Sequence, residues 1–328
     1  MSAPTYLHPG YVLGVDLGGT KLSAGIADSS GMILAERRTP TSAGGIDVVE
    51  QIARLAEELC ADIGATSDQI LATGIGAAGV PDSEGNHLSQ APNLSALSNV
   101  SLGPALSERL KHPVVLENDV NISALGELHY GVGRGHSDFV FVSVGTGIGM
   151  GIIADGRLVR GSSGAAGEIG YLPMGTDALA PENHVRGPLE EVVAGDRLDA
   201  RYFAASGRRL TTPEIFALAT KGDAAAIEAL DTESRWLAAA LVAVNAVLDP
   251  EIFVIGGGIG GRKELLPFIR TWLQRHGSSL NIYTSELGQR APLAGALQLA
   301  LQAGGTASTV PVRVGASWPD TTQKGQAR

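Results

Sequence analysis

Short apolar runs rich in valine and isoleucine recur along the chain, and several lead directly into glycine-rich turns. Apolar runs of roughly four to eight residues, bounded by glycine or polar residues, are typical of buried β-strands. A short polar link between two runs, such as Asp155-Gly156, indicates a β-hairpin. The strands expected from this pattern span residues 11–15, 22–27, 32–37, 70–75, 113–116, 139–144, 150–154, 158–159 and 252–255.

Apolar residues at three- and four-residue spacing lie between these strands and predict amphipathic helices. Ile46, Val49 and Ile52 fall on one face of the first such segment. Thr211 and Glu214 have the spacing of a capping box, which marks the start of a helix. The helices expected from this pattern span residues 46–63, 102–110, 120–128, 189–205, 212–219, 224–248, 263–275 and 292–302.

The order strand, glycine turn, hairpin, helix, strand and helix occurs twice, which predicts an α/β protein of two units with related plans. We expect a smaller N-terminal domain over residues 10–120 and a larger C-terminal domain over 121–290. The C-terminal helix, at about 291–302, is expected to pack back on the first domain. Residues 304–328 are rich in small and polar residues and are expected to form a disordered tail.

Three glycine-rich turns follow expected strands, at residues 14–21, 144–149 and 254–261. A glycine lets backbone N–H groups approach a phosphate that a Cβ atom would block. Any tight link after a strand has a similar sequence, so each turn by itself is weak evidence. Three such turns on one chain indicate a nucleotide held from several sides. The chain lacks the Gly-x-x-x-x-Gly-Lys-Ser/Thr pattern of a P-loop.

Composition narrows the classes of function. The chain of 328 residues has a net charge of −10, which disfavours nucleic-acid binding. Its single cysteine, Cys60, excludes an intrachain disulfide and a four-cysteine zinc site. No apolar run reaches the roughly 18–20 residues of a membrane span, and the first ten residues do not resemble a signal peptide. We therefore expect a cytoplasmic protein with no membrane partner.

The first glycine turn carries a candidate site for phosphate and metal. Asp16 ends a buried strand, where its carboxylate is placed to hold Mg²⁺ through water. The amides of Gly19, Thr20 and Lys21 then face a terminal phosphate, and Lys21 adds positive charge. The alternative is a plain hairpin turn with Asp16 capping its own loop. The density of the Asp-x-Gly-Gly-Thr segment favours the phosphate site.

Three further carboxylates are candidates for contact with a hydroxyl substrate. Asp119 lies where a strand ends and a helix begins, and is placed to accept a hydroxyl proton during phosphoryl transfer. From spacing alone a helix N-cap is the favoured interpretation of Asp119. Glu168 and Glu190 lie near glycine-rich bends and are placed to bind sugar hydroxyls. Taken singly, each of these two is more often a solvated acid or a cap.

These segments together resemble the ROK family of sugar kinases and sugar-responsive repressors, over roughly residues 11–302. The motifs that carry the resemblance are 16–21, Ala91-Pro92-Asn93-Leu94, Glu117-Asn118-Asp119-Val120-Asn121, 144–170 and 256–258. The resemblance implies two actin-like ATPase (ribonuclease H-like) α/β domains that flank an interdomain cleft, where ATP and a hexose meet. It also makes Asp119 the catalytic base, which reverses the preference for a helix cap.

The resemblance assigns the remaining site residues by position. The sugar-binding residues that it implies are Gly79, Asn93, Asn118, Asp119, Glu168, Tyr171 and Glu190. The residues implied for the nucleotide are Asp16, Gly18, Gly19, Thr20, Lys21, Thr146, Gly147, Gly256, Gly257 and Gly258. Asp16 would also position Mg²⁺. Relatives are often dimers, so a homodimer is expected, with a sugar and ATP as small-molecule partners.

Two departures from the family pattern concern zinc and substrate. Tyr171 stands where the family has a histidine that contacts the sugar and binds a structural zinc. The family's cysteine cluster is also missing, because residues 174–190 contain no cysteine. No structural zinc is therefore expected. The resemblance implies glucose or a related hexose as the substrate, with an amino sugar as the alternative. A phenol is bulkier than an imidazole, so Tyr171 either shifts the preference toward a substituted sugar or leaves glucose binding intact.

Other functions fit the residues less well. A repressor needs a helix-turn-helix domain, and only thirteen residues precede Gly14. A non-catalytic sugar sensor would not be expected to retain Asp16, Asp119 and the glycine turns. A polyphosphate kinase would call for a basic groove near the first turn, where the sequence offers Lys21 and a few arginines.

Overall fold

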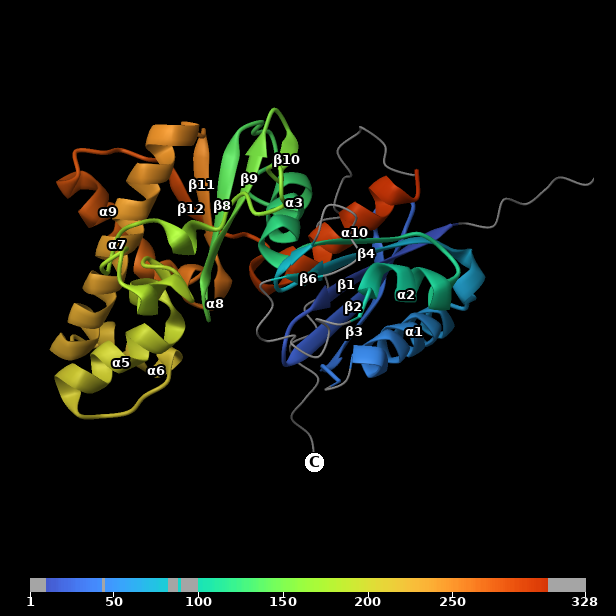
Figure 1. Cartoon of the computed structure of the whole chain (residues 1–328), viewed down its shortest axis with the longest axis horizontal. Coiled ribbons are helices and arrows are strands. Elements are labelled where there is room, and N and C mark those ends of the chain that lie inside the picture. The colour runs from blue at the N-terminus through green and yellow to red at the C-terminus, as the bar shows by residue number, and fades with distance from the viewer. Residues whose placement is uncertain (1–9, 43–44, 82–87, 90–99, 306–328) are drawn as a thin grey trace, which may run out of the picture.

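The computed structural model describes residues 10–42, 45–81, 88–89 and 100–305. Within these ranges lie two five-stranded sheets, each covered by helices on both faces (Figure 1). The strands and helices of the first sheet occupy one half of the molecule, and those of the second sheet occupy the other. Helix α3 (Asp119–Tyr130) lies between the two halves.

The first sheet has the strand order β3-β2-β1-β4-β7. Strands β1 to β3 form an antiparallel meander, while β4 and β7 run parallel to β1. The bounds of these strands are β1 Tyr11–Leu17, β2 Lys21–Asp28, β3 Ile33–Pro40, β4 Ile70–Ala77 and β7 Val114–Asn118.

The second sheet repeats this plan with the order β10-β9-β8-β11-β12. Again an antiparallel meander, here β8-β9-β10, is followed by two strands that run parallel to its first strand, β8. Its strands are β8 Phe139–Val144, β9 Ile148–Ala154, β10 Arg157–Val159, β11 Ile252–Gly256 and β12 Ile282–Thr284. A small two-stranded sheet, β5 (Val80–Pro81) with β6 (Leu88–Ser89), completes the strands of the described residues.

Alternation along β1 divides its side chains between two cores. Leu13 and Val15 are fully buried in a core with residues of α1 (Gly45–Asp62) and α2 (Leu102–Leu110). Val12 lies on the opposite face, against α10 (Ala291–Ala303). Successive residues of a strand point to opposite faces, so an almost wholly apolar strand predicts a sheet covered on both sides.

The second sheet is covered in the same way. Val140 and Val142 pack in the larger core, with the helices of the C-terminal half. Phe139 and Phe141 point to the other face and contact Ala124 of α3 and its neighbours. The helices in the larger core include α5 Gly195–Ser206, α6 Thr212–Ala219, α7 Ala224–Leu248 and α9 Leu266–Arg275.

Helices α3 and α10 cross at very short range between the two sheets. A Cβ atom at Gly295 of α10 would lie 1.6 Å from the carbonyl oxygen of Ile122, and one at Gly126 of α3 would lie 2.4 Å from that of Ala291. Helix α3 packs against β8 and β9 as well, so it contacts both sheets. Glycine at the crossing is what allows the helix that starts at Asp119 to fit there.

Most expected elements are present, and the main difference lies between residues 189 and 205. The continuous helix expected over 189–205 is wrong: Ala194 is extended, and α4 (Glu190–Val193) ends there before α5 begins. The amide of Gly195 instead donates to the carbonyl of Gly145, 2.8 Å away. Strand β12 and the short helix α8 (Gly257–Gly260) were not expected. The capping box of Thr211 and Glu214 is confirmed.

Helix α10 packs on β1 and β4 of the first sheet. The domain bounds 10–120 and 121–290 stay a prediction, and nearly all of the expected tail lies outside the described residues.

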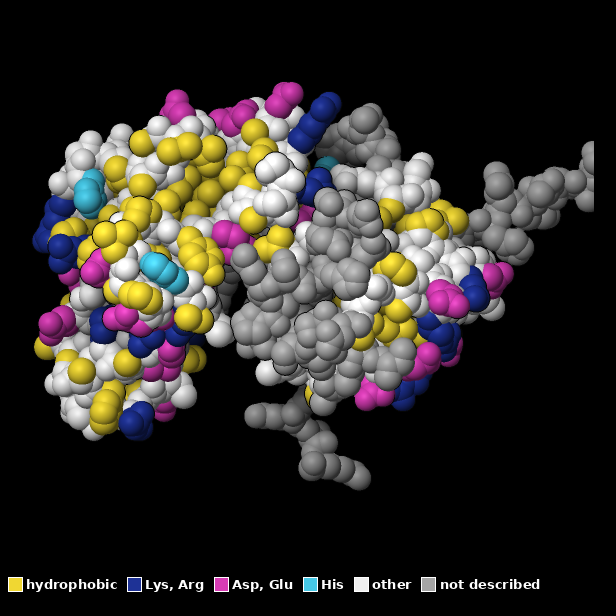
Figure 2. All heavy atoms as spheres, viewed as in Figure 1, with side chains coloured by type: hydrophobic (Ala, Val, Ile, Leu, Met, Phe, Trp, Pro, Cys, Tyr) yellow, Lys and Arg dark blue, Asp and Glu magenta, His cyan; other side chains and the backbone are white. Residues whose placement is uncertain are grey.

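Basic and acidic side chains are interspersed on the face seen in Figure 2. None of the described helices is long and apolar enough to span a membrane.

Candidate active site

The first and second glycine turns occupy equivalent places in the two sheets. One joins β1 to β2 and the other joins β8 to β9, and in each sheet these are the first two strands of the meander. The third turn follows β11, which runs parallel to β8. The repeated plan therefore supplies glycine turns from both halves of the chain.

The first turn closes tightly between Gly18 and Lys21. The Gly18 amide donates to the carbonyl of Lys21 at 3.0 Å, so this amide is used within the turn. Among the described residues, nothing accepts a hydrogen bond from the amides of Gly19 or Thr20. Thr41 braces the turn from outside, because its hydroxyl donates to the Gly18 carbonyl at 2.7 Å. Two amides are thus left available to an anion.

Asp16 shares one row of the sheet with a serine and an arginine. The strand register pairs Asp16 with Ser23 and Ser23 with Arg38, and the Arg38 Nε donates to the Ser23 hydroxyl at 3.3 Å. Burial raises the pKa of Asp16 to about 6, while the charges of Lys21 and Arg38 act to lower it. A carboxylate that is costly to ionise in this place is stabilised by a cation.

Asp119 is the first residue of α3 and lies beside the end of β7. The N-cap is Asn118, whose side-chain oxygen accepts from the amides of Val120 at 2.8 Å and Asn121 at 3.2 Å. Capping is therefore done mainly by the neighbouring residue. Burial, and after it the charge of Asp16, raises the pKa of Asp119 to about 7. A carboxyl that titrates near neutral pH is suited to general base chemistry.

The two glutamates extend this group of carboxylates. Burial raises the pKa of Glu168, and the nearby charge of Glu190 adds to the effect. The charge of Glu168 in turn contributes to the raised pKa of Asp119. Asp16, Asp119, Glu168 and Glu190 come from four separate elements, yet each influences the next electrostatically. The structure thus brings together four carboxylates that the sequence places far apart.

Glu190 also reaches the second glycine turn. Its Oε2 accepts from the amide of Ile148 at 2.9 Å. A Cβ atom at Gly147 would lie 2.4 Å from the same oxygen, so only glycine fits there without moving the carboxylate. The second and third turns meet as well, because a Cβ at Gly145 would lie 3.6 Å from the amide nitrogen of Gly258. Gly258 itself has no described atom within 4 Å of its Cβ position, which leaves open space in front of it.

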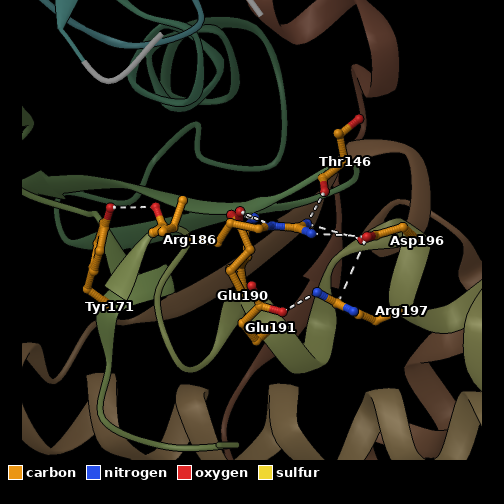
Figure 3. A network of polar contacts seen from close by, with 9 residues as sticks. Thr146, Tyr171, Arg186, Glu190, Glu191, Asp196 and Arg197 are labelled. Atoms are coloured by element: carbon orange, nitrogen blue, oxygen red, sulfur yellow. Dashed lines mark hydrogen bonds and ion pairs between the residues drawn. The ribbon is translucent and has the colours of Figure 1, made fainter. Parts of the chain in front are cut away.

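Arg186 links the carboxylates to the second turn (Figure 3). Its Nε donates to Oε1 of Glu190 at 3.2 Å, and its terminal nitrogens bind Asp196 at 3.0 and 3.1 Å. One of them also reaches the carbonyl of Thr146 at 3.4 Å. Beside it, Arg197 pairs with Glu191. Both oxygens of Glu190 are therefore held by the protein.

Tyr171 lies at the edge of this network, and 45% of its surface is exposed. Its hydroxyl donates to the carbonyl of Val185 at 3.3 Å, across the loop that carries no cysteine (Figure 3). Two further hydrogen bonds hold the same loop. The amide of Leu189 donates to the Gly170 carbonyl at 3.0 Å, and the hydroxyl of Thr176 donates to the Pro188 carbonyl at 3.2 Å. Polar contacts of the chain itself hold the loop together.

Of the two remaining residues expected to bind the sugar, Gly79 and Asn93, the structure describes only Gly79. The carbonyl of Gly79 accepts from Nδ2 of Asn118 at 3.0 Å, which places Gly79 beside the start of α3. Asn93 lies outside the described residues. Among the residues that the structure describes, no group of three or more histidine, cysteine, aspartate or glutamate side chains is placed to hold a metal ion.

Proteins of known family and function resemble this chain over most of its length. The sequence model described as "ROK family" matches residues 12–303. The chain belongs to the ROK family. It is 32% identical over 318 residues to a glucokinase of Streptomyces coelicolor, covering 89% of this chain and 98% of that one. It is 30% identical over 274 residues to an N-acetyl-D-glucosamine kinase of Escherichia coli, covering 80% of this chain and 89% of that one.

A solved ROK structure agrees with the fold. The glucokinase of Streptomyces griseus in complex with glucose and AMPPNP is 30% identical, with a TM-score of 0.73. The match covers 89% of this chain and 100% of that chain. This ROK protein is a sugar kinase with the actin-like ATPase fold, as its sequence predicts.

Several residues around the site of this ROK kinase were not expected from the sequence. Arg186 could have been noticed because it precedes Glu190 by one helical turn, the spacing of a side-chain ion pair. Arg38 and Arg160 gave no such signal. Arg38 becomes part of the site only through the register of β2 with β3, and Arg160 only through contact between the two halves.

Proposed function

We propose that this ROK kinase transfers the γ-phosphoryl group of ATP to the 6-hydroxyl of glucose or a related hexose, with Asp119 as general base. The observation that carries the proposal is the position and pKa of Asp119. It begins α3 between the two halves, next to Asp16 and Glu168, and its pKa is raised to about 7. A base of that pKa is about half ionised at neutral pH and still binds a proton well.

The reaction follows from these positions. Asp119 accepts the proton of the 6-hydroxyl as that oxygen forms a bond to the γ-phosphorus. The bond between the γ-phosphorus and the bridging oxygen breaks, and ADP leaves with the electron pair. The free amides of Gly19 and Thr20 stabilise the charge on the phosphoryl oxygens, together with Lys21. Asn118 and Glu168 orient the sugar beside Asp119, and Glu190 supports both the sugar and the second turn.

The nucleotide is assigned to the space that the turns leave open. The amides of Thr146 and Gly147 face the phosphates, and Gly256, Gly257 and Gly258 border the adenosine. The support for this assignment is the meeting of the second and third turns and the open space in front of Gly258. A relative of known structure carries AMPPNP, an analogue of ATP.

The residues present fit a magnesium ion that arrives with ATP. Asp16 is a carboxylate whose ionisation burial disfavours, and a cation relieves that cost. Mg²⁺ is commonly held by one or two carboxylates together with water and substrate phosphates. When bound, the ion neutralises charge on the phosphate oxygens. Asp16 would hold it through water.

The identity of the sugar depends on the surroundings of Glu168 and Tyr171. An amino-sugar kinase is the second candidate, because Tyr171 replaces the family histidine and one relative is an N-acetyl-D-glucosamine kinase. The homodimer, the cytoplasmic location and the absence of structural zinc stay predictions of the sequence.

The test is an ADP-release assay with Mg-ATP against a panel of sugars. The panel holds glucose, mannose, N-acetylmannosamine, N-acetylglucosamine, glucosamine and 3-amino-3-deoxyglucose. Turnover with glucose or mannose supports the main proposal, and turnover confined to an amino or N-acetyl sugar supports the second candidate. A folded protein that binds ATP but turns over none of the six would contradict both and favour a sensor.

A further inference from the structure

An ion pair joins the two halves of the molecule immediately before Asp119. Arg160 follows β10 of the second sheet, and its Nε donates to Oε2 of Glu117 at 2.5 Å. Glu117 belongs to β7 of the first sheet. The Glu117 side chain is 4% exposed and that of Arg160 is 49% exposed, so a buried carboxylate depends on a partner from the other half. Removing one partner of such a pair leaves a buried charge uncompensated.

The other oxygen of Glu117 holds the residues around the base. Its Oε1 accepts from the amide of Asn118 at 3.0 Å and from Nδ2 of Asn121 at 2.9 Å. Asn118 precedes Asp119 and caps α3, and Asn121 follows it by two residues. The orientation of Asp119 is therefore tied to the carboxylate that Arg160 binds.

The backbone of Arg160 also holds the loop that leads to Glu168. Its carbonyl accepts from the amide of Ala166 at 3.1 Å, which closes the loop that leads to Glu168. Gly167 then packs on β9, where its carbonyl accepts from the amide of Met150 at 2.9 Å. Gly167 has a φ of +98°, and a Cβ atom there would lie 1.8 Å from the Met150 carbonyl oxygen. The loop from Arg160 to Glu168 thus has little freedom.

The same loop touches the first half at a second point. Gly164 has a φ of +83°, and a Cβ atom there would lie 3.0 Å from the carbonyl oxygen of Pro81 in β5. The loop is therefore held against the first half both by the ion pair with Glu117 and by the backbone contact at Pro81.

We propose that Arg160 is a positioning residue, and that its ion pair with Glu117 sets the separation of Asp119 and Glu168 in the state that transfers the phosphoryl group. Asp119 is fixed by the Glu117 end of the pair, and Glu168 by the Arg160 end. A sugar held by Glu168 then presents its hydroxyl to Asp119 at the right distance. This inference rests on the proposed function in taking Asp119 as base and Glu168 as a sugar ligand.

The experiment compares Arg160→Met with Arg157→Met. Arg157 is an exposed arginine three residues earlier on β10, and its side chain binds nothing among the described residues. Because a misplacement of about 1 Å can cost about 100-fold in rate, we expect kcat to fall about 10–100-fold in Arg160→Met. The KM for ATP should stay within about twofold, since no nucleotide contact changes. Arg157→Met should match wild type throughout.

Two further variants separate positioning from general damage. Arg160→Lys keeps the charge and one donor, so it should recover much of the lost kcat. The double variant Arg160→Met/Glu117→Gln should lose no more kcat than the worse of its two single variants, because each substitution removes the same ion pair. The inference is overturned if folded Arg160→Met keeps kcat within twofold of wild type, or if the two losses simply multiply.

A readout without turnover keeps the inference separate from the proposed function. Hydrogen exchange of the apoprotein should be faster in Arg160→Met than in wild type at two separate segments, residues 118–121 and 161–168. Arg157→Met should leave both unchanged. If wild type turns over none of the sugars, the proposed function fails, while faster exchange at both segments still supports the positioning role. Unchanged exchange at 118–121 refutes that role whatever the activity.

Discussion

Single residues around the start of α3 combine burial with charge. Asp16 and Asp119 have pKa values raised to about 6 and about 7, and each is ionised at a cost that burial imposes. The charge of Asp16 contributes to the raised pKa of Asp119, after burial. A protein keeps such an arrangement where the charges serve a ligand or a reaction. The site is therefore expected to trade stability for activity.

Replacing Asp119 by asparagine should separate activity from folding. Without the base, kcat is expected to fall by at least about 100-fold, while sugar binding stays measurable by calorimetry. In wild type, kcat/KM should rise with pH as Asp119 ionises near pH 7. Near-normal turnover in Asp119→Asn would mean that the base has been assigned wrongly.

The same variant should change how stability depends on pH. The folded protein holds the Asp119 proton more tightly than the unfolded chain, so its contribution to the free energy of unfolding is present below the ordinary pKa. That contribution is lost as pH rises through about 7. Asp119→Asn should therefore melt at a higher temperature than wild type at pH 8, with little difference near pH 4. A lower melting temperature at pH 8 would contradict the direction of this shift.

Replacing Tyr171 by histidine should alter substrate preference more than folding. The Tyr171 hydroxyl makes one long hydrogen bond to Val185, and nearly half of the residue is exposed, so the fold depends little on it. We expect the ratio of kcat/KM between glucose and the amino sugars to change in Tyr171→His. Tyr171→Phe, which removes only the hydroxyl, serves as the control. An unchanged sugar profile in Tyr171→His would remove the role in specificity.

At the scale of elements, packing of α3 decides where the base lies. The helix is buried on most sides, between β8 and β9 on one side and α10 on the other. Its start is held by Asn118 and Glu117, and its middle by the glycine crossing with α10. A shift of α10 would therefore be transmitted to Asp119 through a rigid helix.

Replacing Gly295 by alanine should test this crossing. The new Cβ would lie 1.6 Å from the Ile122 carbonyl oxygen, so the two backbones must separate. We expect the free energy of unfolding to fall by about 1–3 kcal/mol. Chemical denaturation would measure the change.

The matched control is Gly258→Ala, where nothing lies within 4 Å of the new Cβ. It should leave stability within about 0.5 kcal/mol of wild type. If Gly258 borders the adenosine, the KM for ATP rises in this variant alone. Equal stability of Gly295→Ala and wild type would show that α3 and α10 do not cross so closely in solution.

At the scale of the whole molecule, the two halves meet through few elements. Helix α3 contacts both sheets, and the segment before α10 is tied to α3 as well. The carboxylate of Glu127 in α3 accepts from the hydroxyl of Ser285 at 2.5 Å and from the amide of Leu287 at 3.1 Å. Side chains of α3 therefore fix the place where the chain crosses back to the first sheet. Closure of the halves on a sugar would exclude water from the phosphoryl group.

Metal removal should separate structural from catalytic ions. Contacts of Tyr171, Thr176 and Arg186 hold the loop where the family places zinc, so we expect a zinc chelator such as dipicolinate to leave the melting temperature unchanged. Turnover should stop in EDTA and return with Mg²⁺. Elemental analysis of the purified protein provides the control. Stoichiometric zinc, with a lower melting temperature after its removal, would contradict the expectation.

The sequence by itself determined the elements and the family. Strand alternation, helical spacing and glycine turns predicted two α/β units, and the motif around Asp119 identified a ROK kinase. These features are local, because they depend on residues close together along the chain. Helix 189–205 was the main error, since the amide of Gly195 bonds to Gly145, fifty residues away.

Only the tertiary structure decided what surrounds each carboxylate. The pKa of Asp119 depends on burial and on Asp16, which lies about a hundred residues earlier in the chain. The links of Arg186 to Thr146 and of Arg160 to Glu117 also join residues separated by at least forty positions. Burial and electrostatic interaction depend on distance in space, and the sequence sets that distance only through the completed fold.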